Sequence, residues 1–256
     1  SAGRVFEMMD RDDYEPKQAG SLKEIERGDI RFDHVSFSYD GKRDVLKEIS
    51  FEVKNGQTIA FVGHTGSGKS SIINLFMRFY EFDRGQILID GQDIKDYSQE
   101  ALRKSIGLVL QEPFLYHGTI ASNIRMYHEE LTDEEIRQAA TFVDVADFIE
   151  SLPGGYDHPV TERGSTLSTG QRQLLAFART IAAQPKILIL DEATANIDQE
   201  TEEMIQNSLK KMRQGRTTIA IAHRLSTIQD ADCIYVLDKG KIIESGNHDQ
   251  LIALGG

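Results

Sequence analysis

The fold is decided by an octapeptide at residues 63–70, which reads Gly63-His64-Thr65-Gly66-Ser67-Gly68-Lys69-Ser70. A continuous apolar run at residues 58–62 precedes it, and apolar residues at helical spacing follow it over residues 69–80. The octapeptide matches the pattern G-x-x-x-x-G-K-S/T and stands between a strand and a helix, as that pattern requires. Its glycines let successive backbone N–H groups face an anion, and the helix N-terminus adds its positive dipole end. The segment therefore predicts a polyphosphate-binding loop.

A second stretch, at residues 186–192, supplies two carboxylates at the end of a predicted buried strand. It reads Lys186-Ile187-Leu188-Ile189-Leu190-Asp191-Glu192. In open α/β sheets, ligands bind at the carboxyl ends of the strands. We then expect Lys69 to contact the β and γ phosphates and Ser70 to place its hydroxyl on Mg²⁺. Asp191 suits an outer ligand of that Mg²⁺, and Glu192 suits the general base for an attacking water.

Short apolar runs separated by helical patterns indicate an α/β protein. Strands are expected at residues 30–37, 49–53, 58–62, 86–90, 106–110, 187–190, 217–222 and 233–237. The continuous apolar runs among them suit buried parallel strands, and residues 238–240 predict a hairpin turn after the last one. Between about residues 112 and 182 the periodicity is helical and strand candidates are absent, which predicts a mostly helical subdomain.

The composition is that of a soluble globular piece, with 39% hydrophobic and 27% charged residues over 256 positions. The net charge of −12 has the wrong sign for neutralising a phosphate backbone, which argues against nucleic acid as a partner. The single cysteine, Cys233, cannot form an internal disulfide. No stretch has the ~20 apolar residues that a membrane-spanning helix needs. Residues 1–27 are polar and rich in both charges, which indicates a linker.

Five further motifs resemble one family, the nucleotide-binding domains of ATP-binding cassette (ABC) transporters. Residues 167–171 read Leu-Ser-Thr-Gly-Gln, close to the usual Leu-Ser-Gly-Gly-Gln signature of that family. Gln111 matches its Q-loop and His223 its switch histidine. Residues 195–198 match its D-loop, and Tyr39 matches the aromatic residue that stacks on adenine. The resemblance runs from about residue 30 to residue 251.

The resemblance implies a P-loop NTPase (RecA-like) core with a mostly parallel sheet, an antiparallel β subdomain and a helical subdomain. It implies an ATPase that uses ATP and Mg²⁺, with the metal held by Ser70, Gln111 and Asp191. The implied catalytic residues are Glu192, His223 and Gln111. The implied ATP-binding set is Tyr39, Gly63, His64, Thr65, Gly66, Ser67, Gly68, Lys69, Ser70 and Ser71. The residues implied to cap ATP held by a second subunit are Ser168, Thr169, Gly170 and Gln171, with Asp198 in the D-loop.

Several segments resemble the exporter branch of the family. They are residues 113–124, residues 162–164 just before the signature, and residues 4–10, which resemble the segment after the last membrane helix of fused exporters. We therefore expect residues 1–27 to be a linker from a membrane domain. Residues 28–256 are expected to form the ATP-binding domain, with its helical subdomain at about 112–182. The full transporter would work at the cytoplasmic face of the cell membrane.

Thr169 departs from the family pattern, which usually has glycine at this position. Its branched side chain stands where the loop backbone should approach a γ-phosphate closely, and a residue other than glycine restricts the loop. Our hypothesis is that the chain is half of a heterodimeric exporter in which one of the two ATP sites is weakened. A homodimer that tolerates threonine is the alternative.

Other functions fit parts of the pattern less well. Soluble ABC-type ATPases that act on DNA carry a long coiled coil between P-loop and signature, whereas Lys69 and Ser168 are 99 positions apart. Ribosomal relatives carry two cassettes per chain, and the negative net charge argues against RNA. A P-loop kinase does not account for residues 167–171. An ATPase that powers export is therefore the favoured function.

Overall fold

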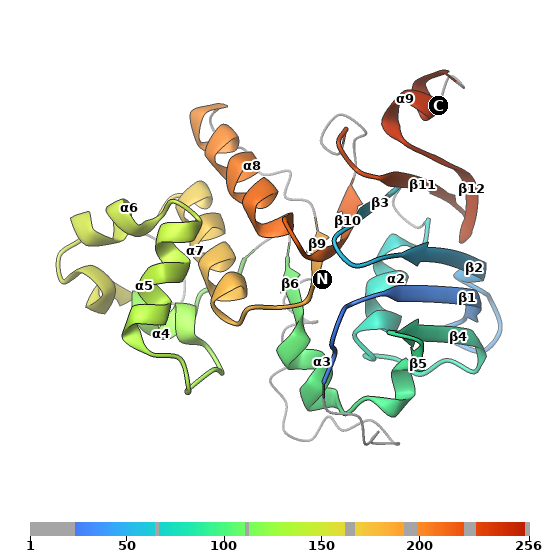
Figure 1. The fold of residues 1–256 in the computed structure, drawn as a ribbon, viewed down its shortest axis with the longest axis horizontal. Coiled ribbons are helices and arrows are strands. Elements are labelled where there is room, and N and C mark those ends of the chain that lie inside the picture. The colour runs from blue at the N-terminus through green and yellow to red at the C-terminus, as the bar shows by residue number, and fades with distance from the viewer. Residues whose placement is uncertain are drawn as a thin grey trace. The chain divides into compact units, whose positions relative to one another are not determined.

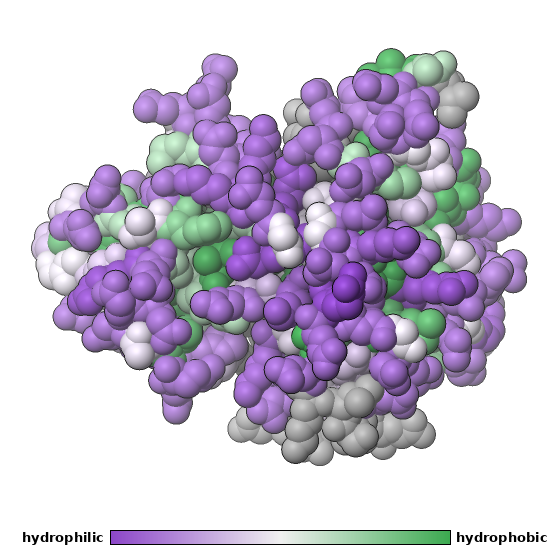
Figure 2. Space-filling view, viewed as in Figure 1, coloured by the Kyte–Doolittle hydropathy of each residue, from purple (hydrophilic) through white to green (hydrophobic). Residues whose placement is uncertain are grey.

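The computed structural model describes residues 24–64, 67–110, 113–161, 167–191, 199–222 and 229–253. The chain divides into two compact units. The first contains the described parts of residues 1–106, 186–192 and 215–256, and the second those of 107–185 and 193–214. The face of the molecule shown in Figure 2 is mostly hydrophilic, with hydrophobic residues in small patches, in keeping with the charged composition.

The first unit contains a four-stranded antiparallel sheet in the order β2-β1-β4-β5 (Figure 1). Its strands are β1 (Ile30–Phe37), β2 (Leu46–Val53), β4 (Arg84–Ile89) and β5 (Gln92–Asp93). Phe32 pairs with Phe51 across β1 and β2, and their rings stack 4.4 Å apart. Because both side chains are almost fully buried, this pair anchors the sheet to the core.

The expected start of β2 at residue 49 is wrong. The strand begins at Leu46, which is buried and pairs with Phe37. Between Leu46 and Ile49 the register shifts by one residue, and Glu48 adopts a positive φ of 47°. This bulge breaks the apolar–polar alternation, and the sequence pattern therefore did not predict that residues 46–48 belong to the strand.

The second sheet is six-stranded, in the order β12-β11-β3-β10-β9-β6; residues 107–109 of β6 belong to the second unit and the other strands to the first. Its strands are β3 (Thr58–Val62), β6 (Ile106–Val109), β9 (Ile187–Asp191), β10 (Thr217–Ala222), β11 (Cys233–Asp238) and β12 (Lys241–Gly246). Strands β9, β10, β3 and β11 run parallel, and β12 returns antiparallel through the hairpin predicted at residues 238–240. Every residue of β3 and β10 is buried, which explains their continuous apolar sequences.

Helix α2 (Lys69–Phe76) follows β3, and the other helical segments of the first unit are η1 (Ile94–Asp96), α3 (Gln99–Ser105) and α9 (His248–Ala253). Helix α2 is shorter than the 69–80 expected from the apolar spacing. The chain leaves the helix because Arg78 takes a left-handed φ of 57°, with Phe79 N–H donating to the Asn74 carbonyl. This is the geometry that usually carries glycine, and the sequence offered no glycine to mark it.

The second unit is mostly helical. Its helices are α4 (Ile120–Arg125), α5 (Asp133–Phe142), α6 (Ala146–Ser151), η2 (Gly155–Asp157), α7 (Thr169–Ala182) and α8 (Gln199–Arg213). Ten of the fourteen residues of α7 are buried, and this helix packs against α4, α5 and α8. The expectation of no strands here was wrong, because β7 (Gly118–Thr119) and β8 (Pro159–Val160) form a two-residue antiparallel pair.

The predicted fold class is confirmed: a mostly parallel sheet, an antiparallel sheet and a set of helices are all present. The predicted limits of the linker and of the helical subdomain stay predictions. No helix within the described ranges is long and apolar enough to cross a membrane.

Candidate functional site

The structure places the glycine loop between the carboxyl end of β3 and the first turn of α2, as predicted. A Cβ built on Gly63 would lie 2.5 Å from the Leu237 carbonyl oxygen and 2.8 Å from Ser67 Oγ, so only glycine fits. Gly68 has a φ of 111° and starts the helix. Among the described residues no side chain caps α2, and no acidic residue lies in its first turn, so the positive end of the helix suits an anion.

Lys69 lies in the first turn of α2 and is only 6% exposed. Its ammonium donates to the carbonyl of Gly63 and, at 3.5 Å, to that of Ala222. These carbonyls stand at or just beyond the carboxyl ends of β3 and β10. A buried ammonium is costly unless it is satisfied. The charge is therefore held at the sheet edge where a polyphosphate would lie.

Ser67 provides a direct sign that the loop fits a ligand. Its Oγ is buried and has no hydrogen-bond partner among the described residues. Buried hydroxyls are nearly always satisfied, so an orphan inside a loop of this type fits a site that is completed by a bound group. Together with the uncapped helix and Lys69, this donor set suits a nucleotide polyphosphate.

Two predicted Mg²⁺ ligands fall within the described residues. Ser70 is exposed at the start of α2, and Asp191 is the half-buried last residue of β9. In the sheet, Ala222 of β10 pairs with Val62 of β3, and its neighbour Ile221 pairs with Asp191. The carboxylate thus ends its strand at the same sheet edge as the loop. Hydroxyl and carboxylate oxygens are donors that Mg²⁺ accepts.

Other predicted site residues lie outside the described ranges. They are Thr65, Gly66, Gln111, Glu192, Asp198 and His223. The exporter-like residues 4–10 and 162–164 also lie outside them. Among the residues that the structure does describe, no group of three His, Cys, Asp or Glu side chains is arranged to hold a metal.

Tyr39 lies two residues beyond the end of β1 and contacts α2 through its hydroxyl. That hydroxyl lies 2.9 Å from Ser71 Oγ and accepts a hydrogen bond of 2.8 Å from Asn74 Nδ2. The side chain is 46% exposed, so nearly half of it is open to a stacking partner. The structure thus brings Tyr39 to the helix that carries Lys69. Asn74 was not among the predicted site residues.

The turn after Tyr39 is organised by Asp40. Its carboxylate accepts hydrogen bonds from the backbone N–H groups of Arg43 and Lys42 and from the Ser38 hydroxyl. These bonds lower the pKa of the Asp40 carboxyl to about 2. At pH values above 3.8, the ordinary pKa of this carboxyl, the bonds therefore help to order the turn. This stabilisation is lost as the pH falls towards 2, because the carboxylate is then protonated.

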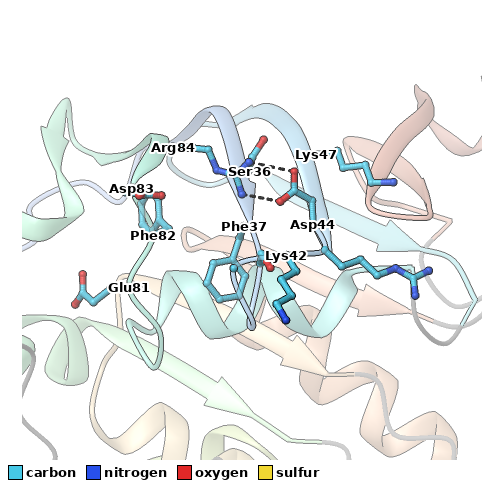
Figure 3. Close-up of a pocket in the computed structure, with 12 residues that line it drawn as sticks. Ser36, Phe37, Lys42, Asp44, Lys47, Glu81, Phe82, Asp83 and Arg84 are labelled. Atoms are coloured by element: carbon cyan, nitrogen blue, oxygen red, sulfur yellow. Dashed lines mark hydrogen bonds and ion pairs between the residues drawn. The ribbon is translucent and has the colours of Figure 1, made fainter.

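A cavity of about 870 Å³ lies beside this turn (Figure 3). Its lining residues are Ser36, Phe37, Ser38, Gly41, Lys42, Arg43, Asp44, Lys47, Glu81, Phe82, Asp83 and Arg84. Arg84 of β4 bonds both oxygens of Asp44, at 2.6 and 3.1 Å, and this lowers the pKa of the Asp44 carboxyl. The pair ties the loop that follows Tyr39 to the antiparallel sheet.

Gly240 in the β11–β12 turn supports the glycine loop, a role the sequence did not reveal. Its N–H donates to the Ser67 carbonyl at 2.8 Å, and its own carbonyl accepts from Lys47 N–H at 2.9 Å. Gly240 has a φ of 82°, and a Cβ there would lie 2.4 Å from the Val45 carbonyl oxygen. The sequence signal, Lys239-Gly240, predicted only a hairpin.

Replacing Gly240 with Ala should therefore weaken ATP binding as well as the fold. The matched control is Gly56→Ala, because Gly56 has a φ of 83° and nothing lies within 4 Å of its Cβ position. Both changes carry the same left-handed backbone penalty of ~1–2 kcal/mol, and only Gly240→Ala adds overpacking of ~1–3 kcal/mol. Urea unfolding and ATP titration measure the two effects. Equal losses in both variants would contradict the supporting role.

The predicted signature residues begin α7 in the second unit. Ser168 Oγ accepts from Gln171 N–H at 3.1 Å, and Gln171 Oε1 accepts from Ser168 N–H at 2.9 Å. This capping box fixes the helix start. Thr169 is the first residue of the helix, and its hydroxyl accepts a weak 3.4 Å bond from Arg172. Gly170 is buried.

Comparison with known proteins agrees with this arrangement. Residues 46–195 match the family described as ABC transporter. The chain is 70% identical over 256 residues to a putative ABC transporter ATP-binding protein, exp8, of Streptococcus pneumoniae. The alignment includes all of this chain and 44% of exp8. The chain is also 53% identical, over 257 residues, to YheH of Bacillus subtilis, described as a probable multidrug resistance ABC transporter ATP-binding/permease protein. That alignment includes all of this chain and 38% of YheH. The chain thus spans less than half the length of these curated relatives.

A solved structure is similar over the whole chain as well. It is described as a bacterial Atm1-family ABC exporter with ATP bound; the chain covers 45% of it at a TM-score of 0.85 and 42% identity. The family match covers more than half of the sequence, and Lys69 and Asp191 lie at the same end of one sheet. The chain therefore belongs to the ABC transporter family, as an ATP-binding ATPase domain of the exporter type.

Proposed function

We propose that this chain is the motor of an ABC exporter, in which two ATP-binding domains close around two ATP molecules and hydrolysis lets them separate. One observation carries the proposal: buried Lys69, the uncapped start of α2 and Asp191 lie at the carboxyl edge of one parallel sheet. The permease and multidrug descriptions of the Bacillus subtilis relative support a role in export.

Each residue has a distinct role in this proposal. Lys69 and the amides at the start of α2 bind the β and γ phosphates, and Tyr39 stacks on the base. Ser70, Gln111 and Asp191 would hold Mg²⁺, which when bound would supply positive charge that polarises the phosphates. Glu192 accepts the proton of the attacking water, and His223 positions that water.

The partners follow from the same family pattern. Ser168, Thr169, Gly170 and Gln171 would contact ATP held by the opposite domain, with Asp198 nearby. Residues 1–27 would connect the ATP-binding domain, residues 28–256, to a membrane domain of the same transporter. The motor would then work at the cytoplasmic face of the cell membrane. No role in nucleic-acid binding is proposed.

Thr169 supports an asymmetric dimer. Its side chain adds a Cβ, a methyl group and a hydroxyl at the first position of α7, and the hydroxyl contacts Arg172. An anion that approaches this helix start closely meets more bulk than it would at a glycine. We infer that this chain pairs with a related half-transporter and offers it the weaker of two signatures. A homodimer remains the alternative.

Dimerisation of a non-hydrolysing variant tests both the motor function and the asymmetry of the dimer. With ATP and Mg²⁺, Glu192→Gln should associate weakly. Adding Thr169→Gly should tighten the homodimer by at least about 100-fold, since each of its two ATP sites would regain a hydrogen bond to a charged group, worth ~1.5–3 kcal/mol. Sedimentation velocity over a concentration series measures the dissociation constant, and Lys69→Ala serves as the monomeric control. Tight association without Thr169→Gly would contradict asymmetry. No ATP-dependent dimer in either variant would contradict the motor function.

A further inference from the structure

The adenine platform proposed above is held by Ser71, which belongs to the predicted site, and by Asn74, Tyr80 and Phe37, which lie outside it. The Tyr39 hydroxyl accepts from Asn74 Nδ2 at 2.8 Å and lies 2.9 Å from Ser71 Oγ, so it bonds two positions one turn apart on α2. An amide N–H only donates, so the tyrosine hydroxyl is left free to donate to the serine oxygen. These two bonds fix where the phenol end of the ring lies.

Two aromatic side chains fix the ring itself. Tyr80 meets Tyr39 with ring centroids 4.8 Å apart and an interplanar angle of 82°, and Phe37 meets it at 4.7 Å and 82°. Both are edge-to-face arrangements, which are favourable for aromatic pairs. Phe37 is buried at 5% exposure, whereas Tyr39 keeps 46% of its surface open. The ring is thus held by its neighbours and by its hydroxyl while much of it stays accessible.

The end of α2 explains how Tyr80 reaches this position. Arg78 takes the left-handed conformation, its N–H donates to the Leu75 carbonyl, and the Phe79 N–H donates to the Asn74 carbonyl. The Arg78 guanidinium is 2% exposed and donates to the Tyr97 carbonyl and to Glu81, which keeps the turn in place. Asn74 therefore takes part in the helix end through its backbone and holds Tyr39 through its side chain.

Resting on the function proposed above, we propose that Asn74 and Tyr80 are positioning residues that hold the Tyr39 ring ready for the base of ATP. Because both belong to α2 or to the turn that ends it, they tie the base platform to the helix whose first residue, Lys69, binds phosphate. A platform ordered before binding loses less conformational freedom when the nucleotide arrives. The pair therefore sets affinity for the base-bearing part of the ligand and leaves phosphate affinity unchanged.

The test compares ATP with inorganic tripolyphosphate, which offers the phosphates without the base. Asn74→Ala and Tyr80→Leu should each weaken ATP binding about threefold to tenfold and leave tripolyphosphate binding within twofold. Tyr80→Phe should restore ATP affinity, because it keeps the ring. Tyr127→Leu is the matched control, since Tyr127 is 56% exposed and belongs to the second unit.

A double-mutant cycle separates positioning from general damage. Tyr39→Phe keeps the ring and removes the hydroxyl, so Asn74→Ala should have no further effect on ATP affinity in that background. An equal loss in both backgrounds, a loss shared by tripolyphosphate, or unchanged ATP affinity would overturn the proposal. Tyr39→Ala distinguishes a failure of this inference from a failure of the proposed nucleotide site. If that variant binds ATP normally, the adenine platform itself is wrong; if only Asn74 and Tyr80 lack effect, this inference alone fails.

Discussion

Glu192→Gln is expected to slow ATP hydrolysis by about 10² to 10⁴, the span typical of a lost general base, while ATP binding persists. Glu192 follows Asp191, the last residue of β9, so it continues the chain from the sheet edge that carries the glycine loop. Glutamine has nearly the same shape as glutamate and cannot take a proton from water. Phosphate release at saturating ATP measures the rate, and equilibrium titration measures binding.

Glu203→Gln is the matched control for that variant. Glu203 is exposed on α8, outside the predicted site. The same substitution there changes the net charge by the same amount and leaves the site unchanged. Its turnover should equal that of the unchanged chain. Retained turnover in Glu192→Gln would remove Glu192 from the role of base and leave water activation to another group.

Lys69→Ala is expected to lower ATP affinity by about 10²-fold or more. A hydrogen bond to a charged group is worth ~1.5–3 kcal/mol, and the lysine is assigned contacts to both β and γ phosphates. The ammonium is buried and is held at the sheet edge by the Gly63 and Ala222 carbonyls, so alanine removes a positive charge that is already in place there. Calorimetric titration with Mg²⁺ and ATP measures the loss.

Lys95→Ala is the control for the removal of a lysine. Its ammonium also donates to a backbone carbonyl, that of Phe82, at 2.6 Å, and it lies outside the predicted site. It should keep ATP affinity within twofold. Thermal unfolding of Lys69→Ala without nucleotide should show little loss of stability, because a buried ammonium contributes a desolvation cost. Affinity within threefold of the unchanged chain would contradict the phosphate role.

The sequence predicted elements well wherever one local pattern decided them. Strands β3 and β10 have the predicted bounds because burial on both faces leaves an uninterrupted apolar run. The predicted helix overran α2 because its end depends on Arg78 in a left-handed conformation, without a glycine to signal it. The start of β2 was missed because a bulge at Glu48 breaks the alternation. Both errors come from backbone conformations with positive φ that residue type did not announce.

The sequence by itself determined the glycine loop, the carboxylates after β9 and the order of the family motifs, because each is a contiguous pattern whose chemistry depends on local spacing. Only the tertiary structure decided what supports them. Gly240 bonds the Ser67 carbonyl, and Asn74 bonds the Tyr39 hydroxyl, although 173 and 35 positions separate the partners. Such contacts follow from strand order and from where a helix ends, and burial and hydrogen bonding across the whole fold select them. A single sequence carries no local pattern that records them.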